Sequence, residues 1–486
     1  MKKTYIIPTL IMCLVVLLIS FNTYAQIGMG TTNPDASSIL EIKSTNKGML
    51  TPRMTSVQRT AISSPANGLL VYDITENSFY FYQNTVWTKI DAETRDNYKL
   101  VKSAADLSEE LTAGGGSKYL LNANTIYEIN GTISLAYPID LNEAYVMGLD
   151  SGQDVLVRIG GTLFEGTKGG FIKNLTASAP AGTIFNLTGT GSENLVFKDA
   201  YAANSNSVGS VSNFKIVFID VAQYAYNATG ITYSNIGDLL ISNTGWQSTN
   251  SGTYETYTGS FDLIQKQGGF MKIDGTAVGI DVSSNPNVSK AVLTGANFDG
   301  TSTAYIKKYT AGTYPHYNFT NSWTVNCPGI PVESDEVSSG NIYYDGTITT
   351  GFIQTVTNNA PLNLLGNSNS NSTTAVNVLR TASPQNNRIT YEGKKARTFQ
   401  LNASLSVRGN SGVGNYYAFF IRKNSTTTLT ETNTLMRVNS TSDISSNSIS
   451  GTVELDPNDY IEIWGQRLTG SGTTSITVFS LNLNIK

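Results

Sequence analysis

A strict alternation of apolar and polar side chains most constrains the fold of this chain. Apolar residues occupy every second position in three segments, residues 399–407, 449–455 and 479–485. Successive side chains of a β-strand point to opposite faces, so this period predicts strands with one buried face. Long helical periodicity is almost absent, and residues 103–111 are the one modest candidate. The chain is therefore predicted to be all-β.

The composition agrees with a β-rich fold that has many turns. Charged residues make up 14% of the chain, while aromatic residues make up 10% and include 26 tyrosines. Typical globular domains are about 25% charged. Disordered chains combine high charge with few aromatic and β-branched residues, which is the opposite pattern. With a net charge of −4 and no basic cluster, nucleic-acid binding is not expected.

The first 25 residues predict a secretory signal peptide. Lys2 and Lys3 precede an apolar run over residues 5–21, and a small residue, Ala25, allows cleavage before Gln26. The alternative is an uncleaved membrane anchor, although the run is short for a span of roughly 20 residues. No later stretch is long and apolar enough to cross a bilayer. We expect an exported protein, extracellular or on the outer-membrane surface, without a transmembrane segment after cleavage.

Residues 26–92 predict a small N-terminal β-meander. Three apolar strands, at residues 69–73, 79–82 and 86–90, are separated by polar turns. The preceding stretch reads TTNPDASS at residues 31–38, KGMLTPRMT at 47–55 and PANGLLVY at 65–72. This pattern resembles a module of exported Bacteroidetes proteins and of the tail fibres of their phages. The resemblance implies a surface or fibre protein in which the module serves attachment or assembly.

The middle region, residues 93–330, predicts a parallel β-helix. Asn174, Asn194, Asn213 and Asn235 each precede a short apolar segment, at offsets of 20, 19 and 22 residues. A repeat of this length suggests stacked coils with one short strand per side and polar corners. The region resembles the right-handed, pectin-lyase-like β-helix of phage tailspikes and many secreted proteins. Ordinary β-sandwich strands are the alternative.

The C-terminal part predicts a linker followed by an antiparallel jelly roll. Residues 331–374 are rich in Pro, Asn and Ser and are predicted to be a linker or neck. Residues 375–486 carry the alternating strands, the segment YAFFIRKN at 417–424 and LDPNDYIEIW at 455–464. These segments resemble the jelly roll of the C1q and tumour-necrosis-factor-like group, which also occurs at phage fibre tips. The resemblance implies a homotrimer.

No catalytic, metal or cofactor site is predicted. The one histidine, His316, has no cysteine or acidic pair nearby, and the chain lacks zinc-ligand spacing, a G-x-S-x-G elbow and a phosphate loop. The alternative is a glycoside hydrolase on the β-helix, which needs two carboxylates about 5–9.5 Å apart. Asp199, Asp220 and Asp238 are the candidates for it, because a coil of about twenty residues places them on neighbouring turns. Solvated corner acids give the same pattern and are the favoured interpretation.

One aromatic cluster is a candidate glycan-binding site. It contains Tyr314, Tyr317 and Trp323, together with Tyr309 and Phe319. Aromatic faces stack on sugar rings, and tyrosine hydroxyls add hydrogen bonds. The alternative is that these residues cap the open end of the β-helix, which has to be protected from solvent and from edge pairing.

The sequence as a whole predicts a trimeric, fibre-like structural or adhesion protein that binds a glycan or a partner surface protein. Two alternatives remain: a tailspike-like enzyme that degrades polysaccharide, and a phage-derived receptor-binding tail fibre. A charge-poor exterior rich in Asn, Ser and Thr suits recognition by many hydrogen bonds.

Overall fold

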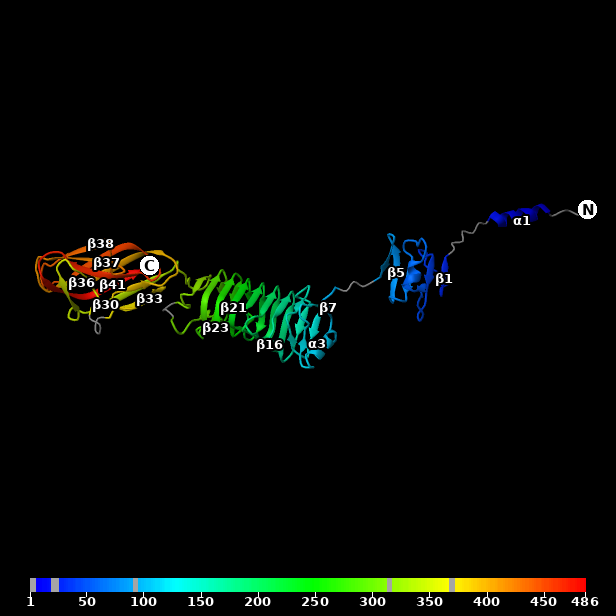
Figure 1. Ribbon diagram of the computed structural model, residues 1–486, viewed down its shortest axis with the longest axis horizontal. Helices are drawn as coiled ribbons and strands as arrows, with labels where there is room; N and C mark the ends of the chain where they lie inside the picture. The colour runs from blue at the N-terminus through cyan, green and yellow to red at the C-terminus, as the bar shows by residue number, and fades with distance from the viewer. Residues whose placement is uncertain (1–5, 19–25, 91–94, 313–316, 367–371) are drawn as a thin grey trace, which may run out of the picture. The chain divides into compact units, whose positions relative to one another are not determined.

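The computed structural model describes residues 6–18, 26–90, 95–312, 317–366 and 372–486 (Figure 1). Helix α1 (Ile6–Leu18) lies in the predicted signal peptide, and the expected cleavage site falls outside the described residues. In the described ranges, no helix has both the length and the apolar character that a membrane span requires. The chain divides into two compact units, Met1–Arg95 and Asp96–Lys486, which are described separately.

The first unit contains the expected meander. Its elements are β1 (Ile27–Met29), β2 (Leu40–Ile42), β3 (Arg53–Met54), α2 (Ser56–Thr60), β4 (Leu70–Asp73), β5 (Ser78–Gln83) and β6 (Val86–Lys89). Strands β4, β5 and β6 pair antiparallel in chain order, β3 adds to β4 in parallel, and β1 pairs with β2 in parallel. Helix α2 begins with a capping box between Thr55 and Gln58, which satisfies otherwise unpaired amides.

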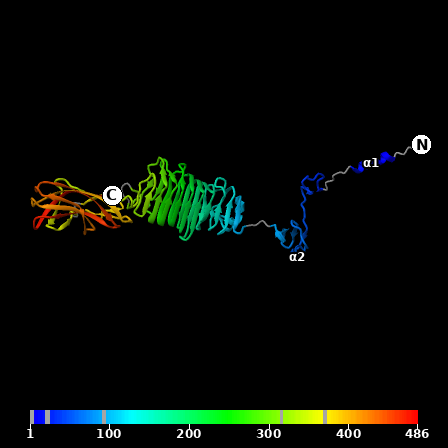
Figure 2. The same ribbon diagram turned by 90° about the horizontal axis from the view of Figure 1, so that it is seen from above.

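The second unit begins with a parallel β-helix, or solenoid, in which β7 to β29 form one continuous hydrogen-bonded sheet (Figures 1 and 2). Its elements are β7 (Tyr98–Val101), η1 (Ala104–Leu107), α3 (Ser108–Ala113), β8 (Tyr119–Leu120), β9 (Ile126–Ile129), β10 (Thr132–Ser134), β11 (Ile139–Asp140), β12 (Tyr145–Met147), β13 (Val155–Val157), β14 (Thr162–Gly166), β15 (Gly170–Lys173), β16 (Thr176–Thr188), β17 (Asn194–Lys198), β18 (Tyr201–Ser212), β19 (Ile216–Asp220), β20 (Gln223–Asn227), β21 (Ile231–Ser242), β22 (Gly245–Trp246), β23 (Thr253–Gln267), β24 (Phe270–Lys272), β25 (Val278–Asp281), β26 (Asn287–Thr294), β27 (Asn297–Asp299), β28 (Ile306–Lys307) and β29 (Trp323–Asn326).

Each turn of the solenoid stacks on the previous one in parallel register. Lys173, Lys198 and Asp220 are paired in this way, and so are Ser242, Gln267 and Thr294 on later turns. The residues that follow them form one corner, and all have positive φ: Asn174, Asp199, Val221, Asn243, Gly268 and Gly295. Asparagine and glycine tolerate this left-handed conformation, which explains their frequency here.

The predicted asparagine register was wrong in detail. Asn174 belongs to the corner just described, whereas Asn213 and Asn235 belong to a second positive-φ corner, and Asn194 begins strand β17. Asparagine suits any left-handed corner, so its spacing reports corners in general and not one aligned column. The mean spacing was therefore too short for a full turn, since paired residues such as Phe171 and Val196 lie 25 apart.

Aliphatic and aromatic side chains fill the solenoid, with one buried ion pair among them. The rings of Tyr224, Trp246 and Tyr254 stack, with centroids 3.9 and 5.0 Å apart. Lys266 takes an inward position between Ile241 and Leu293, and its Nζ lies 2.9 Å from Glu255 Oε1. Trp246 Nε1 and Tyr257 Oη also donate to the Glu255 carboxylate, so this buried charge is fully hydrogen-bonded.

Replacing Lys266 by methionine is expected to destabilise the solenoid by about 3–5 kcal/mol, because Glu255 would stay buried without its cation. Chemical denaturation followed by circular dichroism measures the change. Lys215→Met is the matched control, since Lys215 is exposed and makes no ion pair with the residues that the structure describes. Equal stability of the two variants would contradict this role for the buried pair.

The solenoid is followed by an antiparallel sandwich around a second apolar core (Figure 1). Its strands are β30 (Ser339–Asp345), β31 (Phe352–Thr357), β32 (Pro361–Asn363), β33 (Thr374–Leu379), β34 (Thr381–Ala382), β35 (Ile389–Tyr391), β36 (Arg397–Gly409), β37 (Tyr416–Lys423), β38 (Thr427–Arg437), β39 (Ser445–Leu455), β40 (Tyr460–Arg467) and β41 (Thr473–Ile485). One sheet has the order β33-β30-β41-β36-β39 with β31 on β41, and the other has β34-β35-β40-β37-β38 with β32 on β40. Leu401, Leu405 and Leu483 point into the core, as their alternation requires.

The predicted fold class is confirmed: the chain is nearly all β, with a meander, a parallel solenoid and an antiparallel sandwich. One segment differs from its prediction. Residues 331–374 were predicted as a linker or neck, yet β30, β31 and β32 from this stretch join the sandwich sheets. Asn358 and Asn359 lie in the turn between β31 and β32, and Pro361 begins β32, so composition alone suggested a linker. The Asn/Ser run at 367–371 lies outside the described residues.

Candidate functional site

The N-terminal module exposes far more apolar surface than it buries. Within residues 26–90, the buried hydrophobic residues are Val71 and Tyr80. The exposed large hydrophobic residues of the same range are Ile27, Met29, Ile39, Leu40, Ile42, Met49, Leu50, Val57, Ile74, Phe79, Val86 and Ile90. So many exposed large apolar side chains on one small module favour association with a partner. We call this set the module surface.

A buried arginine holds the meander together beneath this surface. Arg59 Nε lies 2.8 Å from Asp73 Oδ2, and the guanidinium lies over the Tyr80 ring at 3.7 Å from its centroid. Burial raises the pKa of Asp73, but hydrogen bonds from Arg59 and from the backbone amides of Glu76 and Thr75 outweigh it, so the pKa falls to about 2. The charged pair orders the sheet and covers the Tyr80 ring, while the module surface stays exposed.

A second apolar surface runs along the outside of the solenoid. Its residues occupy one outward position on successive turns and are paired in register: Tyr98, Ile126, Tyr145, Phe171, Val196, Phe218 and Leu240. Tyr145 is 42% exposed, and the others are half-buried. With turns about 4.8 Å apart, this stripe is about 29 Å long. Inward neighbours such as Phe197 and Ile241 fill the core, so the stripe is additional to the core.

A cleft of about 330 Å³ lies beside the stripe and contains two glutamates. Lys168 Nζ is 3.8 Å from Glu143 Oε1 and 3.2 Å from Glu193 Oε1. These two oxygens therefore lie at most about 7 Å apart, below the upper limit of about 9.5 Å for glycosidase carboxylates. The backbone amide of Thr190 is the largest cause of the lowered pKa of Glu193, which leaves this carboxyl ionised. A general acid needs a raised pKa, so the pair as it stands is suited to binding and not to proton donation.

The three candidate aspartates do not meet at one point. Lys198 lies between two of them: its Nζ pairs with Asp220, and both Asp220 and Asp199 raise the pKa of Lys198. Asp238 aligns with Ile216, four residues before Asp220 along the strand, and so lies about 13 Å away in that direction. The arrangement is a set of charge pairs between turns, not a pair of catalytic carboxylates.

The aromatic candidates lie at the C-terminal end of the solenoid, where most of them are covered. Trp323 is 1% exposed, donates from Nε1 to Tyr309 Oη at 3.0 Å, and packs on Phe319 with ring centroids 4.6 Å apart. Tyr317 is half-buried and lines a cleft of about 410 Å³. Tyr314 and His316 lie outside the described residues. The positions of Trp323, Tyr309 and Phe319 are those of a cap on the last turn.

A buried glutamate fixes this cap. Glu333 accepts hydrogen bonds from the backbone amides of Asn318 and Phe319 at 2.7 and 2.9 Å. Burial opposes its charge more strongly than these bonds favour it, and the pKa of Glu333 is raised from 4.5 to about 6. The folded cap therefore binds a proton more tightly than the unfolded chain does.

The stability of the second unit is expected to fall as the pH rises from about 4.5 through about 6, because Glu333 loses its proton more readily in the unfolded chain. Thermal melting between pH 4 and pH 7 measures this. Glu333→Gln stays uncharged and is expected to lose this part of the pH dependence. An unchanged profile in that variant would show that the dependence comes from other groups.

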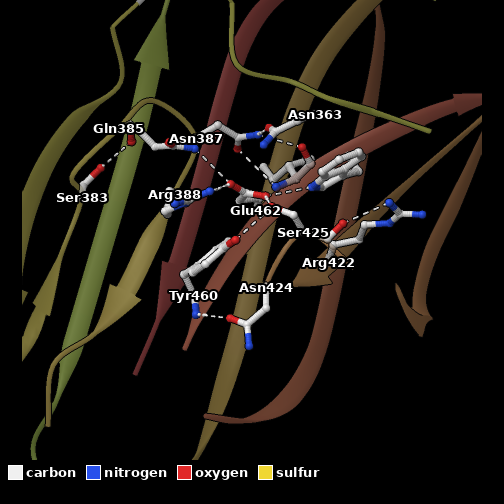
Figure 3. Close-up of polar contacts among 12 residues, drawn as sticks. Asn363, Ser383, Gln385, Asn387, Arg388, Arg422, Asn424, Ser425, Tyr460 and Glu462 are labelled. Carbon is white, nitrogen blue, oxygen red and sulfur yellow. Dashed lines mark hydrogen bonds and ion pairs between the residues drawn. The ribbon is translucent and has the colours of Figure 1, made fainter. Parts of the chain in front are cut away.

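A second buried carboxylate lies in the sandwich (Figure 3). Glu462 accepts from Arg388 Nη2 at 2.7 Å, Ser425 Oγ at 2.8 Å and Trp464 Nε1 at 3.1 Å. Arg388 also stacks on the Tyr460 ring, at 3.6 Å from its centroid. Both carboxylate oxygens are occupied by protein donors, so the cluster ties loops to the sheet and leaves no free group for chemistry.

Sequence reasoning missed the surfaces that the structure brings out. The stripe residues Val196, Phe218 and Leu240 stand inside continuous apolar runs, which read equally well as core. A solenoid wall that faces water needs polar residues at its outward positions. Runs that are apolar on both faces of a strand therefore could have indicated this surface from sequence. The Glu143–Lys168–Glu193 group joins residues from successive turns and has no local motif.

Comparison with known families gives one match. Residues 28–104 match the family described as "Phage tail like trimerisation region". The match covers the module and ends just after β7, which carries the first stripe residue, Tyr98. A trimerisation region of this kind joined to a β-helix supports a tail-fibre-like or tailspike-like protein. No curated protein sequence matches the chain.

Solved structures give only distant similarities. Eiger TNF from S. frugiperda is 10% identical with a TM-score of 0.22, over 31% of this chain and 93% of that one. The PRD1 vertex protein P5 is 12% identical with a TM-score of 0.19, over 30% and 94%. The enzymatically active domain of tailspike protein 4 of bacteriophage CBA120 is 9% identical with a TM-score of 0.24, over 90% and 77%. These scores are too low to decide fold or activity, and the architecture rests on the strand pairing above.

Proposed function

We propose that this chain is one subunit of a homotrimeric, exported fibre protein that serves as a structural or adhesive element at a cell surface. The observation that carries the proposal is the imbalance of the N-terminal module, in which two hydrophobic residues are buried and a dozen large ones are exposed in the range 26–90. Burying a large apolar side chain is worth about 1.5–3 kcal/mol. A module of this size gains that energy by packing against copies of itself.

The family match supports three copies. Residues 28–104 resemble a trimerisation region, and this range contains the start of the stripe and the whole module surface except Ile27. In a trimer with its subunits side by side, a straight apolar stripe along each solenoid is the surface that faces the axis. We therefore assign the stripe as a continuation of the trimer interface.

The cellular setting is part of the same proposal. The signal-peptide pattern and the Bacteroidetes-type motif support an exported protein, on the outer-membrane surface or beyond it. The module associates three chains, while the solenoid and the sandwich are left to contact a glycan or a surface protein. A phage-derived tail fibre with the same build is the closest variant of this proposal.

Glycan cleavage is a second candidate because Glu143 and Glu193 share one cleft at a suitable separation. A reducing-end assay on envelope polysaccharides tests it. Activity that is lost in Glu143→Gln and kept in Asp238→Asn would favour the enzyme. Binding without cleavage would favour the adhesive role.

Polar substitution of the module surface is expected to dissociate the trimer. In Ile27→Asp with Leu50→Asp, charge replaces two side chains that are 60% and 82% exposed in the single chain and buried in the proposed assembly. Native mass spectrometry of the chain without residues 1–25 is expected to give three-chain particles, and single chains for the variant.

Lys43→Asp with Lys47→Asp is the control, because it introduces the same two aspartates at exposed positions of the module that are already charged. A three-chain particle for the Ile27/Leu50 variant as well would remove the module surface from the interface. Circular dichroism of each variant checks that the solenoid and the sandwich stay folded.

A further inference from the structure

A cleft of about 620 Å³ lies where the last turns of the solenoid meet the sandwich, and it is lined by cations. Lys290 comes from β26, while Lys394, Lys395 and Arg397 come from the loop between β35 and β36 and the start of β36. Two acidic residues, Asp335 and Glu336, also line it. Four cations against two carboxylates leave a net formal charge of +2, within a chain whose net charge is −4.

Among the residues that the structure describes, these four cations lack an acidic partner, unlike most lysines of the solenoid. Elsewhere a lysine pairs with an acidic residue one turn away, as in Lys118–Asp140, Lys168–Glu193, Lys198–Asp220, Lys272–Asp299 and Lys307–Asp281. Within the described part of the chain, none of Lys290, Lys394, Lys395 and Arg397 makes an ion pair, and one of the two carboxylates that line the cleft already accepts from other donors. Asp335 Oδ1 accepts from Arg380 Nη1 at 2.6 Å, and its Oδ2 accepts from the Lys394 backbone amide at 3.0 Å.

A buried arginine, Arg380, pairs with Asp335, one of the residues that line the cleft. Arg380 is 1% exposed and donates to the backbone carbonyls of Asn321, Trp323 and Glu333, besides its pair with Asp335. These bonds join the end of the solenoid to the sandwich. Burial lowers the pKa of Lys394, the nearby Arg380 and Lys290 lower it further, and Asp335 raises it.

Hydroxyl groups complete the lining. Ser322 and Thr324 face the cleft, and in the described part of the chain their hydroxyls make no hydrogen bond to protein. Fixed cations beside free hydroxyls recognise an anionic group carried on a polar ring or chain. The volume suits one or two sugar rings, since ligand pockets span about 300–1,000 Å³.

We propose that this cleft binds an acidic saccharide, with the anionic group of one sugar held by Lys290, Lys394, Lys395 and Arg397 and its hydroxyls held by Ser322 and Thr324. All of these residues belong to one chain, so the site goes beyond the proposed trimer and does not depend on it. The anion is a carboxylate or a phosphate or sulfate ester, and the test separates a charged sugar from a free anion.

Isothermal titration calorimetry of the chain without residues 1–25 tests the site with three probes: an oligosaccharide that contains glucuronic acid, the methyl ester of the same oligosaccharide, and inorganic phosphate. The acidic oligosaccharide is expected to bind, and to bind more weakly as NaCl rises from 50 to 300 mM, because salt screens the cations. The methyl ester is expected to bind at least about tenfold more weakly, a loss of about 1.4 kcal/mol.

The variant Lys290→Gln with Lys395→Gln is expected to lose at least about tenfold in affinity for the acidic oligosaccharide. Lys215→Gln, an exposed lysine away from the cleft, is the matched control and is expected to bind like the unaltered chain. Both lysines of the variant are exposed, so its melting temperature is expected to stay the same.

Equal affinity of the acid and its ester, unchanged binding by the Lys290/Lys395 variant, or no binding at 50 mM NaCl would each overturn the site. Phosphate binding as tight as that of the oligosaccharide would overturn the assignment of a sugar. The mass of the same samples reports the oligomer separately, so failure of this site and failure of the trimer are distinguishable.

Discussion

The structure depends on apolar side chains that a single chain leaves exposed to water. Folding is driven mainly by removing such groups from water, and a module with Val71 and Tyr80 as its buried hydrophobic residues has little of that energy by itself. Its buried charge pair, Arg59 with Asp73, orders the sheet and covers the Tyr80 ring, but leaves the module surface exposed. Self-association is the proposed way to cover that surface, and residues 28–104 match a trimerisation region.

The backbone register of the solenoid determines which residues share a surface. Each turn stacks on the previous one in parallel, so residues far apart in the chain line up as columns. One column is the apolar stripe, another is the left-handed corner of Asn174 and Asp199, and pairs such as Lys198 with Asp220 run between turns. Asp199 and Asp220, which look catalytic in sequence, thereby have a lysine as neighbour. The end of the solenoid differs, because Lys290, Lys394, Lys395 and Arg397 outnumber the two acidic residues that line the same cleft.

Much of the architecture was predictable from local patterns. The period-two alternation at Phe399–Val407 lies within β36, and the aromatic run from Tyr417 lies within β37, because an alternating strand needs only its own residues to be recognised. The positions of the turns in the solenoid were harder to predict from the sequence. Corner positions accept asparagine, aspartate and glycine alike. Asn213 and Asn174 therefore looked equivalent in the sequence, although they occupy different corners. The basic cleft could not be predicted from the sequence, since Lys290 and Lys395 are brought together by tertiary packing alone.

Sedimentation equilibrium of the chain without residues 1–25, over a wide range of concentrations, tests the central claim most directly. If the apolar side chains of the module are buried between copies, the buoyant mass equals that of three chains and holds down to low concentration. A mass of one chain at every concentration would mean that the module tolerates its exposed apolar surface, and would contradict the account.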